Sequence, residues 1–255
     1  PVVWWDGVTR PYSATADANK SFFQTGNTTE HNLSFSKAGD FGSVRVSMNR
    51  TDNNAIVPNS GFDKTSFNIG SNLNLSKKMK VEAVAGYNRY NRKNTPSMGD
   101  NNSIGKFLTY GFPADYINIE KDVYVMPDGS KNKFDNNTYP MSYPYSSYTN
   151  LNWHTYEQNT TLQRDQLAGS IKLSADVTPW LNLMGRSGVD FSSNKFETKN
   201  RPEDAAGYQG QYGFEMNKDY TVTAEALATA HKSDLFKDFD ASLSVGTSTW
   251  YNKFE

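Results

Sequence analysis

The residues with the most evident binding chemistry are aromatic side chains between positions 139 and 156, in the stretch YPMSYPYSSYTNLNWHTY. Flat aromatic faces among hydroxyl and amide groups suit sugar rings, peptides or a protein partner. The candidate ligand- or partner-binding residues are Tyr143, Tyr145, Tyr148, Trp153 and Tyr156. Ordered long loops also use such rings to pack onto themselves, so packing within the loop remains the alternative.

The sequence contains no catalytic constellation. His31, His154 and His231 are far apart, and no cysteine is present, which excludes disulfides and thiolate ligands. The stretch MPDGSKNKFDNN at 126–137 carries several side-chain oxygens but lacks the spacing of a calcium-binding loop, and its Pro-Asp-Gly sequence favours a turn. We therefore expect no enzyme activity, no metal site and no cofactor.

Composition limits the classes of partner. The chain has 255 residues and a net charge of -1, so it lacks the basic surface typical of nucleic-acid binding. The mean hydropathy of -0.73 excludes a stretch of the roughly 20 apolar residues that a spanning helix needs. A spanning β-strand needs apolar residues only at alternate positions, so a membrane β-barrel remains compatible with this composition.

Apolar and polar residues alternate with period two in several segments, which is typical of strands with one apolar face. In KVEAVAGYNRYN, at 80–91, one face carries Val81, Ala83, Ala85 and Tyr87. The eight predicted strands are 31–37, 43–51, 65–75, 80–91, 166–176, 181–191, 220–231 and 240–251. The alanine-rich stretch 222–230 is also compatible with a helix, but its alternating threonines favour a strand.

The predicted connections differ in length on the two sides of the sheet. Short connections at 37–42, 76–79, 177–180 and 234–239 alternate with long ones at 52–64, 92–164 and 195–219. Outer-membrane barrels show this asymmetry, with the short turns in the periplasm, whereas a soluble sandwich has no need of it. We therefore predict an all-β, transmembrane antiparallel β-barrel, with residues 92–164 as a long extracellular loop.

Aromatic residues recur at one height of the apolar faces, at the strand ends next to the long connections. They are Phe67, Tyr87, Phe191, Tyr220 and Tyr251. Aromatic side chains at one height on an outward face form an interfacial girdle. The alternative is that aromatic residues simply favour strands and strand ends.

With the strands placed, residues 22–81 resemble the start of the barrel in SusC/RagA-type TonB-dependent outer-membrane transporters. The matching motifs are Phe23-Gln24-Thr25-Gly26, Asn32-Leu33-Ser34-Phe35-Ser36, Arg45-Val46-Ser47 and Ala55-Ile56-Val57-Pro58-Asn59-Ser60. Residues 164–191, RDQLAGSIKLSADVTPWLNLMGRSGVDF, resemble a later segment of the same family. The chain departs from the family at Ala55, where the family has glycine, and in the turn Ala38-Gly39-Asp40, which has lost one glycine.

The resemblance implies an early part of a larger barrel of the 22-strand type, in the outer membrane of a Gram-negative bacterium. Residues 1–255 would then form part of one transmembrane domain of about eight strands, without the family's plug domain. The implied function is TonB-dependent import of an oligosaccharide or peptide, with TonB contacted through a missing N-terminal region. The implied partners are a SusD-like surface lipoprotein and the lipid bilayer.

Two other functions remain open on the sequence. A SusC-like barrel could act as a structural subunit of a larger outer-membrane complex without importing anything. A soluble glycan-binding β-domain is also compatible with the alternation of apolar and polar residues. The inward positions of the predicted strands are largely Ser, Thr, Asn and Gly, which fill a closed eight-stranded barrel poorly and suit a wide lumen better.

Overall fold

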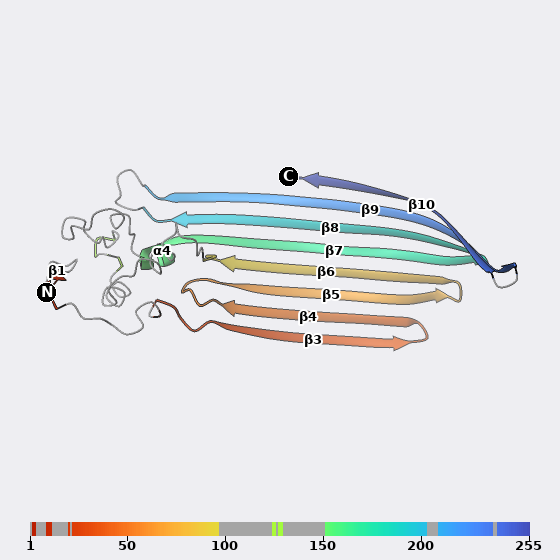
Figure 1. Cartoon of the computed structure of the whole chain (residues 1–255), viewed down its shortest axis with the longest axis horizontal. Coiled ribbons are helices and arrows are strands. Elements are labelled where there is room, and N and C mark those ends of the chain that lie inside the picture. Colours follow the sequence, from red (N-terminus) through yellow and green to blue (C-terminus); the bar gives the residue numbers. More distant parts are fainter. Residues whose placement is uncertain are drawn as a thin grey trace.

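The computed structural model of the chain is dominated by one antiparallel β-sheet of eight strands, which follow one another in chain order (Figure 1). The structure describes residues 2–3, 9–11, 20, 22–96, 124–125, 127–129, 151–202, 209–236 and 239–255. The strands of the sheet are β3 (Asn27–Gly39), β4 (Gly42–Asn54), β5 (Gly61–Ser76), β6 (Met79–Lys93), β7 (Gln158–Thr178), β8 (Leu181–Asn200), β9 (Gln211–Phe236) and β10 (Phe239–Phe254). A separate pair, β1 (Val2–Val3) and β2 (Thr9–Arg10), and helix α4 (Leu151–Glu157) lie outside this sheet.

All eight predicted strands are confirmed, including 222–230 within β9. The strands are longer than predicted, because the hydrogen-bonded ladder continues where the alternation ends. At the start of β7, for example, residues 158–165 are all polar except Leu162 and show no alternation, yet they remain paired with β8. The connections therefore shrink to 55–60, 94–157 and 201–210 on one rim and to two-residue turns on the other. The sequence predicted neither α4 nor the β1–β2 pair.

The turn between β3 and β4 requires a glycine. Gly42 has a φ of 118°, in the region that side chains other than glycine rarely adopt. A Cβ atom at this position would also lie 1.9 Å from the carbonyl oxygen of Asn72 on β5. The close approach of β5 therefore requires glycine at position 42.

The register of the sheet aligns the apolar positions of neighbouring strands into rows. One row crosses seven strands near their middle, through Leu33, Met48, Phe67, Tyr87, Leu167, Phe191 and Tyr220. It holds four of the five aromatic residues predicted at one height, but Tyr251 pairs with Val222 and lies outside it. The next row towards the short turns runs through Phe35, Val46, Ile69, Ala85, Gly169, Val189, Val222 and Tyr251. The apolar faces predicted strand by strand thus join into one continuous face.

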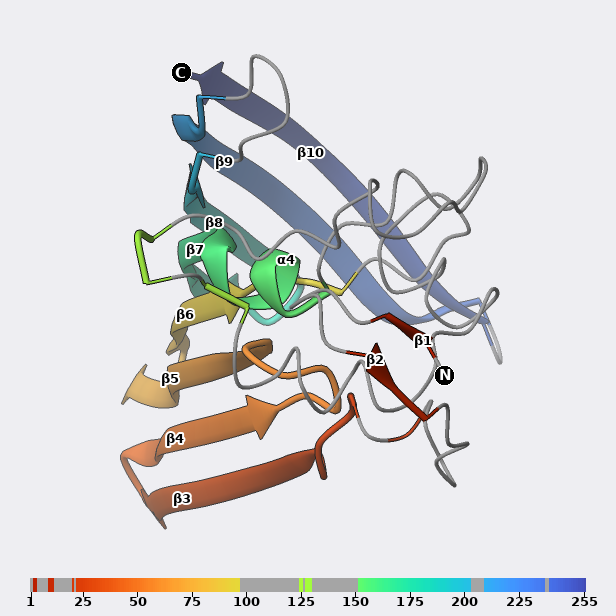
Figure 2. The same ribbon diagram turned by 90° about the vertical axis from the view of Figure 1, so that its left-hand side faces the viewer.

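This apolar face is the convex side of the sheet. On β7 the large apolar side chains Leu167, Ile171 and Leu173 are exposed, whereas the intervening residues 166, 168, 170, 172 and 174 are half-buried. Side chains diverge on the outside of a curved sheet and converge on its inside, so the apolar set lies outside. Figure 2, viewed along the strands, shows this curvature, with α4 on the concave side.

The sheet is open rather than closed. Within the part of the chain that the structure describes, β3 and β10 each have one neighbouring strand, so each leaves one edge of its backbone unpaired. The buried apolar residues among the described positions are Phe22, Val57, Trp153 and Leu162, most of them near the long connections. The wide apolar face is consequently not covered by any described element. No helix among the described residues is long and apolar enough to cross a membrane.

Candidate functional site

The candidate site is the rim of the sheet where the connections 55–60, 94–157 and 201–210 meet, called the long-connection rim below. Three asparagines from different parts of the chain, Asn59, Asn94 and Asn159, lie together there. Asn94 Nδ2 donates to the carbonyl oxygen of Asn59 at 2.9 Å and to Asn159 Oδ1 at 2.9 Å. Asn59 and Asn94 have φ values of 57° and 48°, a left-handed conformation that asparagine tolerates better than most residues.

The asparagines also hold the end of α4. The last carbonyl groups of a helix have no partner within it and need one from outside. Asn59 Nδ2 donates to the carbonyl oxygen of Thr155 at 2.7 Å, and Asn159 Nδ2 to that of Tyr156 at 2.8 Å. The backbone N–H of Arg201 donates to the carbonyl oxygen of Glu157 at 3.1 Å. Three separate segments therefore fix one short helix on the rim.

Arg201 fixes the helix a second time through its side chain. Its guanidinium lies 3.3 Å from Glu157 Oε2 and 5.4 Å from the centre of the Trp153 ring. Trp153 is fully buried. A cation over a desolvated indole face and a paired carboxylate are both favourable. The connection 201–210 is therefore joined to α4 by both charge and packing.

Tyr156 lies at the edge of this arrangement. Its ring stacks on that of Tyr124, with centroids 5.4 Å apart and planes inclined by 27°. Burial raises the pKa of the Tyr124 phenol, and the Glu157 carboxylate acts in the same direction. The Tyr124 phenol is consequently neutral at physiological pH and available only as a hydrogen-bonding group.

The structure thus places only part of the set proposed from sequence. Trp153 and Tyr156 lie on α4, with the Trp153 ring enclosed and the Tyr156 ring half-buried. Tyr143, Tyr145 and Tyr148 lie outside the described residues. Contact of this set with a ligand or partner stays a prediction. Sequence reasoning missed the residues that hold the rim together, namely Asn59, Asn94, Asn159 and Arg201.

A local signal for two of them was present. Asn59 follows a proline, in Pro58-Asn59-Ser60, and Asn94 comes two residues before Pro96. Asparagine beside proline is typical of a tight turn with positive φ. That signal predicts the backbone conformation of each residue, but it does not predict their meeting.

The concave face of the sheet is polar and largely self-paired. Lys172 Nζ lies 3.0 Å from Glu82 Oε1 across β6 and β7, and Arg186 lies 3.5 Å from Glu225 across β8 and β9. Such a surface can exchange hydrogen bonds with a polar ligand without carrying a large net charge. Among the described residues, no group of three His, Cys, Asp or Glu side chains is placed to hold a metal ion.

An antiparallel meander with long connections on one rim, two-residue turns on the other and an apolar convex face is a partial β-barrel wall. Two solved structures resemble it. One is described as the RagAB peptide transporter: its TM-score is 0.66 and its sequence identity 18%, over 93% of this chain and 26% of that chain. The other is the RagAB peptide importer in its "closed-closed" state, with a TM-score of 0.65 and 17% identity over 94% and 27%.

This likeness shows a RagA-like β fold, and the neighbours that share it are transporters rather than enzymes. The chain spans about a quarter of the length of the solved chains it resembles. No protein-family model and no curated protein matches the sequence.

Proposed function

We propose that the chain forms part of the wall of an outer-membrane transport barrel in a Gram-negative bacterium, with its convex face in lipid. The row through Phe67, Tyr87, Phe191 and Tyr220 at the edge of the apolar face carries this proposal. On β8 the apolar face extends ten residue steps from Leu181 to Phe191. That is about 33 Å along the strand, or about 25 Å of height at a tilt of roughly 40°, which matches the apolar band of such barrels.

Aromatic residues at the other rim support the same orientation. Phe41, Trp180, Phe236 and Phe239 lie in or beside the two-residue turns, and all are exposed. Membrane barrels carry aromatic girdles at both interfaces. A soluble β-domain would gain nothing by exposing large rings at both ends of an exposed apolar face.

The transported ligand is proposed to be a peptide, with an oligosaccharide as the other candidate. One feature favours a peptide, namely the likeness to the RagAB peptide transporter. The polar concave face is compatible with either ligand. In this proposal residues 94–157 are extracellular. They meet a SusD-like lipoprotein and the ligand there, with Tyr143, Tyr145, Tyr148, Trp153 and Tyr156 as the candidate contact residues. Energy would come from TonB.

An uptake experiment with the full-length protein tests this function. Cells that lack the gene are complemented with it and offered labelled peptides or oligosaccharides of defined length. We expect gene-dependent uptake of one class, and its loss when the inner-membrane proton gradient is dissipated. Membrane insertion without uptake of any offered class would favour a structural subunit. Recovery of the full-length protein in the aqueous fraction without detergent would contradict the barrel altogether.

A further inference from the structure

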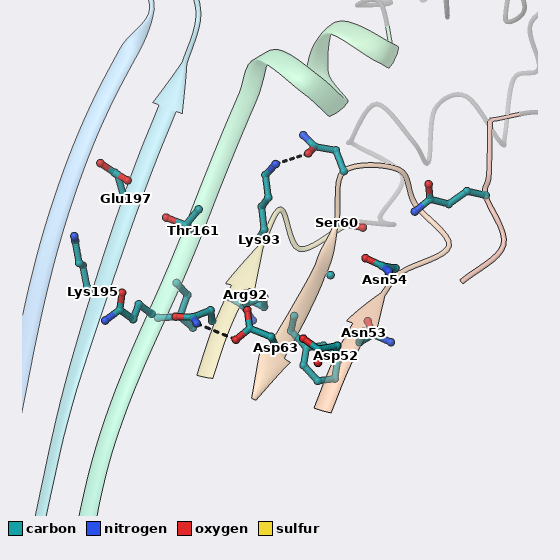
Figure 3. A pocket seen from close by; sticks show the side chains of 17 residues that line it. Asp52, Asn53, Asn54, Ser60, Asp63, Arg92, Lys93, Thr161, Lys195 and Glu197 are labelled. Atoms are coloured by element: carbon teal, nitrogen blue, oxygen red, sulfur yellow. Dashed lines mark hydrogen bonds between the residues drawn. The ribbon is translucent and has the colours of Figure 1, made fainter. Parts of the chain in front are cut away.

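A polar hollow of about 700 Å³ lies at the long-connection ends of β4 to β8 (Figure 3). Its walls come mainly from two rows of residues in register. The first row is Asp52, Asp63, Asn91, Gln163 and Lys195, and the second is Asn54, Gly61, Lys93, Thr161 and Glu197. The proposed transport function makes no use of this hollow.

The hollow is on the convex face. Both rows belong to the same alternating set of positions as Phe67 and Tyr87, which lie on the apolar side. The row between these two rows contributes Asn53, Phe62, Arg92 and Leu162 to the lining as well, but not Phe196 on β8. The hollow therefore opens away from the lumen, on the side that the proposed orientation turns towards lipid.

The carboxylates that line the hollow, Asp52, Asp63 and Glu197, are paired with Arg50 and Lys199, which lie beside it. Arg50 donates to Asp63 Oδ2 at 3.0 Å and to Asp52 Oδ2 at 2.9 Å, and Asn91 Nδ2 donates to Asp63 Oδ2 at 3.0 Å. Lys199 lies 3.0 Å from Glu197. Paired carboxylates with amide and hydroxyl groups in register suit the many hydroxyl groups of a saccharide.

An aromatic face borders the same surface. The Phe214 ring is 51% exposed and lies 5.3 Å from Lys195 Nζ. Phe214 pairs with Glu197 in the ladder, so its side chain projects from the convex face as well. An exposed ring beside hydrogen-bonding groups offers the apolar side of a pyranose a surface to stack on.

The height of the hollow suggests where the saccharide comes from. Asp63 precedes Phe67 by four residue steps on β5, which places it nearer the long connections, about 13 Å along the strand and about 10 Å in height above the aromatic row. If that row marks the interface, the hollow lies at headgroup level. We propose that this hollow binds the saccharide headgroup of a membrane glycolipid in the outer leaflet. The inference rests on the proposed orientation, but it does not depend on the transported ligand.

The chain offers a matched pair of variants to test it. Asn91 and Gln163 face each other across β6 and β7 on the convex side, and Asn88 and Gln166 face each other on the concave side of the same two strands. The full-length protein is purified from outer membranes in mild detergent, and retained glycolipid is counted by native mass spectrometry. We expect the N91A/Q163A variant to retain glycolipid about tenfold less tightly, and the N88A/Q166A variant to match the parent.

Delipidated protein distinguishes the possible sources of the sugar. It is titrated with the intact glycolipid, with the oligosaccharide released from it and with a phosphatidyl lipid. The proposal expects tight binding of the intact glycolipid, weaker competition by the oligosaccharide and little effect of the phosphatidyl lipid. Equal binding of both lipids, equal affinity for free oligosaccharide, or equal retention by the two double variants would overturn it. The two proposals can fail separately. If no ligand is taken up but N91A/Q163A selectively loses glycolipid, the transport function is contradicted and the glycolipid site is supported.

Discussion

The side-chain amide of Asn59 donates a hydrogen bond of 2.7 Å to the carbonyl oxygen of Thr155, which is 96 residues further along the chain. This bond joins a six-residue connection to a helix at the far end of the long connection 94–157. Asn59 Nδ2 also donates to Asn159 Oδ1 at 3.1 Å, and Asn59 Oδ1 accepts a hydrogen bond from Lys93 Nζ at 2.5 Å. Both polar atoms of the side chain are therefore bonded. Asn59 thereby couples the position of α4 to the ends of β6 and β7.

Replacement of Asn59 by glycine should loosen α4 without unfolding the sheet. Glycine keeps the positive φ of 57° at no steric cost but removes the amide, whose bonds contribute about 1 kcal/mol each. We expect the backbone amides of 151–157 to exchange roughly fivefold to tenfold faster, measured by hydrogen exchange and mass spectrometry. The Asn54→Ala variant is the control, because Asn54 ends β4 just before the connection 55–60 and bonds to Asn27 on β3. Unchanged exchange in the glycine variant would contradict the role given to Asn59.

An arginine should be tolerated on one face of the sheet and not on the other. Leu183 lies in the apolar convex set, paired with Ala175 and Ala228, whereas Ser170 lies on the polar face. In the full-length protein Leu183→Arg should cost about 2–4 kcal/mol of unfolding free energy in lipid, and Ser170→Arg much less. Reversible denaturant unfolding in lipid vesicles measures the difference. Equal losses would show that the convex face is not in the bilayer.

A single introduced cysteine reports the side of the membrane on which the long connections lie. These 255 residues contain no cysteine, so each introduced cysteine is the only one in this part of the protein. A cysteine replacing Ser146, within the connection 94–157, should react with a membrane-impermeant reagent in intact cells that lack the lid lipoprotein. A cysteine replacing Lys77, in the turn between β5 and β6, should react only after the outer membrane is permeabilised. The reverse pattern would invert every strand.

The aromatic residues of the long connection should separate into two groups by their effect. Trp153 is fully buried against Arg201, so Trp153→Ala should destabilise the rim locally by about 3–5 kcal/mol, seen as faster proteolysis near α4. Alanines at Tyr143, Tyr145 and Tyr148 should leave proteolysis unchanged and weaken capture of ligand or lipoprotein. Calorimetric titration with each binding partner checks the second group. Normal binding by the triple variant would remove these tyrosines from the proposed site.

The two unpaired edges of the sheet predict the behaviour of these 255 residues when they are expressed alone. Exposed edges of β3 and β10 pair with other chains in water and leave unsatisfied backbone groups in lipid. We expect inclusion bodies, and no heat-modifiable monomer on gels after refolding in detergent. A stable, folded monomer of this length would instead indicate that the sheet needs no further strands.

The sequence by itself determined the eight strands, the assignment of each side chain to a face and the common height of Phe67, Tyr87, Phe191 and Tyr220. Tyr251, predicted at the same height, lies one row nearer the short turns. The confirmed features repeat every second residue, so local alternation encodes them. The sequence did not predict the strand ends. Residues 158–165, for example, are polar except for Leu162 and show no alternation, and their ladders with β6 and β8 place them in the sheet.

Tertiary structure alone decided the arrangement of the long-connection rim. Turn chemistry predicts the backbone of Asn59 and of Asn94, but their meeting with Asn159 depends on the register of β5, β6 and β7. The same holds for Arg201, which reaches Trp153 and Glu157 only because β7 and β8 end side by side. Contacts between residues distant in the chain leave no periodic trace in the sequence, since each partner satisfies the other only after the sheet has formed.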